Sequence, residues 1–129
     1  MLLIRETQLE AFEAARREPL AARIAERIAR ELPDDAEALR GDELLAFARH
    51  GCTRAARWNL RSDGSAFIVT VLALALGPRF DDDPRFTAVL STGSEAQRVR
   101  AMLAAASPEV VNDLRAAAGD PGRWPELLD

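Results

Sequence analysis

An apolar segment at residues 66–76 restricts the fold of this chain more than any other feature of the sequence. Its composition is apolar on all sides and rich in Val and Ile, so periodicity alone does not separate a buried helix from a buried strand. A single strand with no apparent partner would leave its backbone N–H and C=O groups unpaired. We therefore predict a central, nearly fully buried helix over residues 66–76, ended by Gly77 and Pro78.

The remainder of the chain has the composition of helices joined by short turns. Ala and Leu dominate the apolar residues and Tyr is absent, which favours helices packed through small and aliphatic side chains over a β-sandwich. Apolar residues recur at helical spacing behind capping residues such as Thr7, Asp42 and Ser94. Besides 66–76, the helical segments expected are 7–33, a short turn at 34–39, 42–58, 84–90, 94–106 and 108–118.

These segments predict a single all-α domain, a compact bundle of about five or six helices with the apolar helix at its centre. The 129 residues are enough for one hydrophobic core without metals or disulfides. Pro19 either kinks the first helix or begins a second one. The tail at 119–129 carries two prolines and Trp124, and the sequence leaves open whether it docks on the domain or stays loose.

Charge and cysteine content exclude several function classes. Seventeen basic and twenty-one acidic residues give a net charge of −4, which disfavours a general nucleic-acid binder. The single Cys52 excludes an internal disulfide and a multi-cysteine metal site, and the single His50 excludes a histidine-rich zinc site. No signal-peptide pattern opens the sequence and segment 66–76 is too short to span a bilayer, so we expect a cytoplasmic protein without a membrane partner.

Three consecutive carboxylates, Asp81, Asp82 and Asp83, raise the question of a cation site. A calcium loop alternates its ligands and ends in a Glu, whereas these acids are adjacent and the corresponding position is Thr92. The alternative is that Gly77 and Pro78 end one helix and Asp83 caps the next, whose first residue is Pro84. We predict that the run ends one helix and begins the next, and that it binds no metal or other cofactor.

His50 and Cys52 are the side chains that suggest a nucleophile and its base. Residues two apart on a helix do not face each other, and His50 falls opposite the apolar stripe that contains Cys52. A buried thiol is usually inert. We therefore predict a surface histidine and a core cysteine, with no catalytic residue.

His50, Arg54, Arg57 and Arg61 recur at helical spacing and form a basic stripe. It is either a solvated face that pairs with the abundant acids or a docking surface for a partner. A phosphate-binding face would need flanking aromatics or a basic surround, and only Trp58 is near. We treat this stripe and the acidic corner at residues 81–83 as two candidate partner-binding faces, with charged rims that steer association.

The segments around the apolar helix also suggest a family. The run GCTRAARWNL at 51–60, the apolar segment and the run LGPRFDDDP at 76–84 resemble small uncharacterised helical proteins of Gram-negative bacteria that are encoded beside type VI secretion spike and effector genes. The resemblance covers residues 4–90, and its sharpest part is the Gly-Pro to Asp-Pro connection. It departs from the family at Trp58-Asn59, where relatives have Tyr-Gly, at Pro19, and at Phe86-Thr87-Ala88, where relatives have a Trp. The last third, from Ser91, has no match.

The resemblance implies an accessory role in secretion. Our first hypothesis is a non-enzymatic interaction protein, an adaptor or chaperone-like partner of a type VI spike or effector. An immunity protein that blocks a toxin is the alternative in the same setting. A nucleic-acid-binding regulator that uses Arg54, Arg57 and Arg61 ranks third, and an enzyme ranks last.

Overall fold

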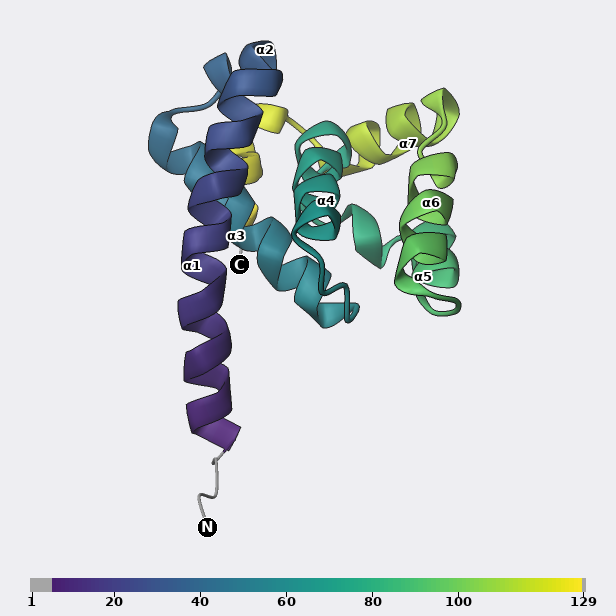
Figure 1. The fold of residues 1–129 in the computed structure, drawn as a ribbon. Helices are drawn as coiled ribbons and strands as arrows, with labels where there is room; N and C mark the ends of the chain where they lie inside the picture. The colour runs from purple at the N-terminus through teal and green to yellow at the C-terminus, as the bar shows by residue number, and fades with distance from the viewer. Residues whose placement is uncertain (1–5, 129) are drawn as a thin grey trace.

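The structure is a computed structural model that describes the backbone of residues 6–128 and the side chains of residues 18–128. The described part is helical, without a strand (Figure 1). Its elements are α1 (Glu6–Glu31), α2 (Pro33–Glu37), α3 (Gly41–Arg57), α4 (Asp63–Leu76), the 3₁₀ helix η1 (Phe80–Asp82), α5 (Pro84–Leu90), α6 (Glu95–Ala105), α7 (Pro108–Ala118) and the 3₁₀ helix η2 (Pro121–Leu127). The all-α prediction is confirmed. The described residues form seven α-helices rather than five or six, because the short segment at Pro33 completes a helix of its own.

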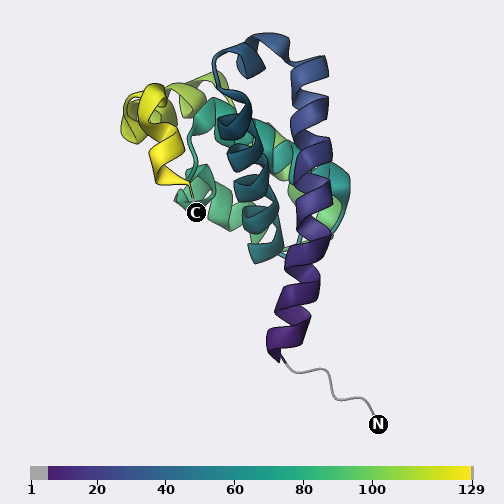
Figure 2. The same cartoon turned by 90° about the vertical axis from the view of Figure 1, so that its left-hand side faces the viewer.

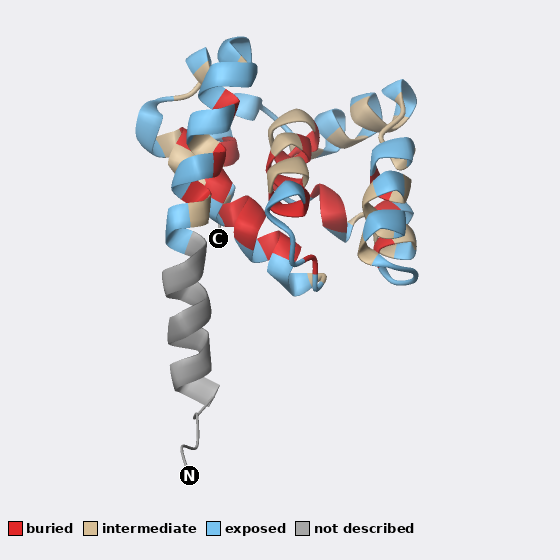
Figure 3. Ribbon diagram, in the orientation of Figure 1, coloured by how far each residue is buried: buried red, intermediate tan, exposed pale blue. Residues whose placement is uncertain are grey.

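Helix α3 lies between α1 and α4. It contacts α1, which it crosses from behind in Figure 1 and lies beside in Figure 2, while α4 packs against it from another side. Helices α5 and α6 pair with each other at the far end of the domain, and α7 returns against α4. Buried residues therefore concentrate on α3 and α4 (Figure 3).

The predicted helix at residues 66–76 is present as the main part of α4. Residues such as Val69, Leu72 and Leu76 are buried in the core. The opposite side, which includes Phe67, is only half-buried, so the expectation of nearly complete burial holds for one side of the helix. There the guanidinium carbon of Arg27 lies 3.8 Å from the centre of the Phe67 ring, in a cation–π contact between α1 and α4.

Gly51 allows α3 and α4 to come into close contact. A Cβ atom at this residue would lie 1.9 Å from Oγ1 and 2.9 Å from Cα of Thr70. The Thr70 hydroxyl donates to the carbonyl of Ala66 on its own helix, so it is satisfied within this dry contact. Only glycine permits this spacing of the two backbones.

Most helix ends lie where the capping residues predict them. Ser62 accepts from the Ser65 N–H at the start of α4, and Ser94 and Gln97 form a capping box at the start of α6. Asn59 follows the end of α3 with a φ of 59°, a left-handed conformation that Asn tolerates better than most residues. The prediction for Asp42 is wrong, because α3 begins at Gly41 and places Asp42 in its first turn, where a negative charge faces the positive helix end.

Both open questions about the chain ends have answers in the structure. Helix α1 continues through Pro19, whose side chain is exposed, and it begins at Glu6 rather than after Thr7, whose side chain lies outside the described residues. The tail docks, because η2 contacts α3 and α7 and buries Trp124 to 2% exposure. Among the described helices, none is both long and apolar enough to cross a membrane.

Candidate functional site

The two charged faces expected to be separate meet in a single cluster. Arg54 Nη2 lies 3.3 Å from Asp82 Oδ2, and Arg57 Nη1 lies 3.2 Å from Asp82 Oδ1. Arg54 Nε also lies 3.6 Å from Asp81 Oδ1, while the Trp58 indole donates to Asp81 Oδ2 at 2.9 Å. We call these five residues, Arg54, Arg57, Trp58, Asp81 and Asp82, the Arg54 network. It joins the last turns of α3 to η1.

Burial divides the Arg54 network into an inner and an outer part. Arg54 and Asp81 are 5% and 1% exposed, whereas about half of the Arg57 and Asp82 side chains is accessible. Arg54 and Asp81 are therefore enclosed within the domain, although the sequence analysis placed them on candidate partner-binding faces. Two cations and two anions also cancel, so the network offers no strong net field to a distant partner.

His50 is buried, which corrects the prediction of a surface histidine. Its Nε2 lies 2.5 Å from the carbonyl oxygen of Pro78, and since a carbonyl only accepts, Nε2 carries the proton. The helical period placed His50 opposite the apolar stripe, and that side of α3 is covered by the connection between α4 and η1. Cys52 is in the core as predicted.

Arg61, the last residue of the predicted stripe, is exposed, and its backbone contributes to a different contact. The Glu95 carboxylate accepts from the N–H groups of Arg61 and Ser62 at 2.7 and 3.0 Å, and from the Ser65 hydroxyl at 2.8 Å. These bonds, led by the one from the Arg61 N–H, lower the pKa of Glu95 to about 2 despite partial desolvation. A carboxylate from α6 thus caps the N-terminal end of α4, a contact that sequence spacing did not reveal.

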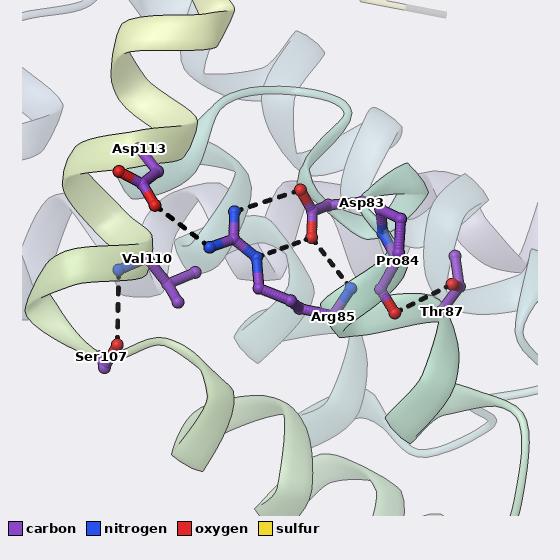
Figure 4. A network of polar contacts seen from close by, with 7 residues as sticks. All are labelled: Asp83, Pro84, Arg85, Thr87, Ser107, Val110 and Asp113. Carbon is purple, nitrogen blue, oxygen red and sulfur yellow. Dashed lines mark hydrogen bonds and ion pairs between the residues drawn. The ribbon is translucent and has the colours of Figure 1, made fainter.

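Asp83 acts as the predicted helix cap. Its Oδ1 accepts from the Arg85 N–H at 2.9 Å, and the Arg85 side chain spans Asp83 and Asp113 of α7 (Figure 4). The hydrogen bond from the Arg85 side chain lowers the pKa of the Asp83 carboxyl below its usual value. In Figure 4 the N-cap of α7, Ser107, also accepts from the Val110 N–H. Asp81, Asp82 and Asp83 therefore bind three different sets of partners.

An apolar groove lies beside these contacts and has no counterpart in the sequence predictions. It has a volume of about 480 Å³ and is open to solvent on one side. Its lining comes from the connection between α4 and η1, from α7 and from η2: Leu76, Gly77, Pro78, Arg79, Phe80, Leu114, Ala117, Ala118 and Leu127. We call it the Gly77 groove. The sequence signal for it was the Gly-Pro pair that ends α4, but its other walls come from residues about 40 positions later.

Arg79 is the charged residue of the groove lining. It is exposed, and within the part of the chain that the structure describes it forms no ion pair or side-chain hydrogen bond. By contrast, the other arginines that flank the acidic run, Arg54, Arg57 and Arg85, each pair with a carboxylate. Arg79 is therefore the residue here whose charge is available to a ligand.

The arrangement supports binding through apolar burial and a single cationic contact. Leu127, at the groove wall, is 44% exposed and is one of two large apolar side chains exposed to this degree among the described residues. Within residues 18–128, no group of three or more His, Cys, Asp or Glu side chains is arranged to hold a metal ion.

No family model, curated protein or solved structure matches the chain.

Proposed function

We propose that the chain is a non-enzymatic interaction protein, an adaptor or chaperone-like partner of a type VI secretion spike or effector. The observation that carries this proposal is the structural use of its reactive side chains. His50 binds the Pro78 carbonyl, Cys52 packs in the core, and Asp81 holds Trp58 and Arg54. These groups stabilise a rigid helical scaffold, which is what a binding module requires.

The motifs that resemble secretion-associated proteins have roles in the same scaffold. Gly51 permits the contact of α3 with α4, Asn59 ends α3, and Asp83 begins α5. Residues 76–84 connect α4 to α5. They include Asp81 and Asp82 of the Arg54 network and the neighbouring cap, Asp83. The motifs that carry the resemblance thus stabilise the scaffold. We assign recognition of the partner protein to the exposed residues around it.

Part of the predicted partner face remains accessible. Arg57, Arg61 and Asp82 are at the surface, next to the buried part of the Arg54 network. Exposed charges of this kind affect the rate of association more than the final affinity. Two carboxylates compensate Arg54 and Arg57, which weakens the case for a nucleic-acid-binding regulator.

Coexpression tests the proposal directly. The tagged chain would be purified together with candidate type VI spike proteins and effectors, and a stable complex with one of them is the expected result. Deletion of the gene should reduce secretion of that effector while leaving the strain resistant to its own sister cells. Sensitivity of the deletion strain to sister cells, with secretion unchanged, would instead establish the immunity role. Copurification of nucleic acid without a protein partner would favour the regulator.

A further inference from the structure

We infer that the Gly77 groove is the docking site for a short acidic and apolar segment of a partner protein. The segment would insert an aliphatic or aromatic side chain between α7 and the residues that follow α4, and place a carboxylate on Arg79. This inference rests on the proposed function and names the site through which that partner is held.

The shape and lining of the groove determine the apolar part of the ligand. Leu76, Pro78 and Phe80 form one wall but are almost fully buried, so the apolar surface that a ligand reaches comes mainly from Leu114 and Leu127 on the other side. A volume of about 480 Å³ accommodates one or two large side chains and lies within the range of ordinary ligand sites. Leu127 has water-accessible apolar surface that such a side chain would cover.

Arg79 determines the charge of the ligand. It is the charged member of an otherwise apolar lining, and it has no carboxylate partner among the described residues. A guanidinium binds a carboxylate through paired, charge-assisted hydrogen bonds, which fix orientation as well as charge. A ligand that is apolar and carries one carboxylate next to its buried side chain therefore complements this groove.

The wall that carries Arg79 is held in place before any ligand arrives. The Pro78 carbonyl is bound by buried His50, and Gly77 takes a φ of 116° that only glycine adopts readily. A Cβ at Gly77 would lie 2.9 Å from the Cβ of Ala118, so α7 approaches this wall as closely as a glycine allows. A preformed wall reduces the ordering cost of binding.

The open side of the groove favours a protein segment over a free lipid. A small ligand is usually surrounded on most of its surface, whereas this groove would leave one side of an acyl chain in water. A segment that belongs to a larger partner can cover the groove with its own surroundings. We therefore assign the groove to a peptide, and a fatty acid serves as the test of the opposite outcome.

Selection from a phage-displayed library of random peptides on the immobilised full chain provides the probe. The expected consensus has an apolar residue near an Asp or Glu. The selected peptide, labelled with a fluorophore, would then be titrated with the wild type and with two groove variants. Arg79→Gln should weaken binding about fivefold, as loss of a partly exposed ion pair does. Ala117→Trp, which fills the groove from its exposed α7 side, should weaken it about tenfold or more.

Two matched controls separate the groove from general effects. Ala116→Trp adds the same side chain at the neighbouring exposed position of α7, outside the groove lining, and Arg100→Gln removes an exposed arginine of α6. Both should bind the peptide like the wild type. A consensus without an acid, or equal binding by Ala117→Trp and Ala116→Trp, would overturn the inference. Decanoate that binds as tightly as the peptide and displaces it would overturn the choice of a protein segment.

The same variants test the peptide site in the groove separately from the proposed role in secretion. If the peptide binds in the groove and no secretion protein copurifies, the groove stands and the secretion role fails. If a secretion protein copurifies equally well with the wild type and with Ala117→Trp, the role stands and the groove fails as its docking site.

Discussion

The indole nitrogen of Trp58 donates a 2.9 Å hydrogen bond to Asp81, whose other carboxylate oxygen lies 3.6 Å from Nε of Arg54. One buried carboxylate thus joins the C-terminal end of α3 to η1, through a hydrogen bond from Trp58 and an ion pair with Arg54. Asp82 pairs with Arg54 and Arg57 from the surface side of the same network. Asp81 and Asp82 are neighbours in the sequence, but we expect them to contribute very different amounts to the free energy of unfolding.

Replacing Asp81 should be far more costly than replacing Asp82. Asp81→Ala removes the carboxylate beside the buried Arg54 guanidinium and leaves the Trp58 N–H without its acceptor, so we expect a loss of about 3–5 kcal/mol in the free energy of unfolding. Asp82→Ala, at a half-exposed position, should cost about 1 kcal/mol or less. Urea unfolding of the two variants beside the wild type measures both, and equal losses would contradict the division into a buried and an exposed part.

Gly51 should tolerate no side chain. Gly51→Ala places a Cβ atom against Thr70, including its backbone, so the two helices must move apart, and we expect a loss of about 2 kcal/mol or more. Gly64→Ala is the matched control, because nothing lies within 4 Å of a Cβ there, and it should be neutral or stabilising by up to about 1 kcal/mol. Thermal unfolding of both variants is the measurement, and similar melting temperatures would refute the close contact.

The Glu95 carboxylate should make the free energy of unfolding decrease at acidic pH. Its pKa is lowered to about 2 in the folded chain from 4.5, so its contribution is present above the unfolded pKa and disappears as the pH falls from 4.5 towards 2. Because the side chain is partly exposed, we expect Glu95→Gln to cost about 1–2 kcal/mol at neutral pH and progressively less in this acid window. Urea unfolding at several pH values checks this.

Glu109→Gln is the control for that series, since Glu109 is an exposed glutamate in the first turn of α7. Its effect on stability should be small at neutral pH. A Glu95→Gln difference that stayed constant between neutral pH and pH 3 would show that the carboxylate charge contributes nothing to the cap.

The sequence predicted local features well because their signals are local. A cap such as Ser94 bonds a backbone group three residues away, so the chain within one turn is sufficient to identify it. The helical character of residues 66–76 followed from the need to satisfy backbone groups. These inferences depend on no distant partner.

The errors come from contacts between distant parts of the chain. Arg54 and Asp82 are 28 residues apart, and His50 is equally far from Pro78, so nothing in helical spacing places them together. Periodicity assumes one buried side on each helix, whereas α3 is also covered by the connection between α4 and η1, which is why His50 is buried on the side opposite the apolar stripe. The Gly77 groove was missed for the same reason, because its walls are brought together only by the return of α7 and η2.

The acidic run should act through Asp83 as a helix cap and bind no cation. Asp83→Ala removes the acceptor of the Arg85 N–H and one of the two carboxylate partners of the Arg85 side chain, and should cost about 1 kcal/mol. Asp83→Asn keeps an oxygen that can cap the helix but loses the charge, so its cost should be smaller. Calorimetric titration of the wild type with calcium, magnesium or manganese should show no heat of binding, because each of the three carboxylates is already paired with an arginine. A micromolar site that Asp82→Asn abolishes, while the chain remains folded, would reverse this assignment.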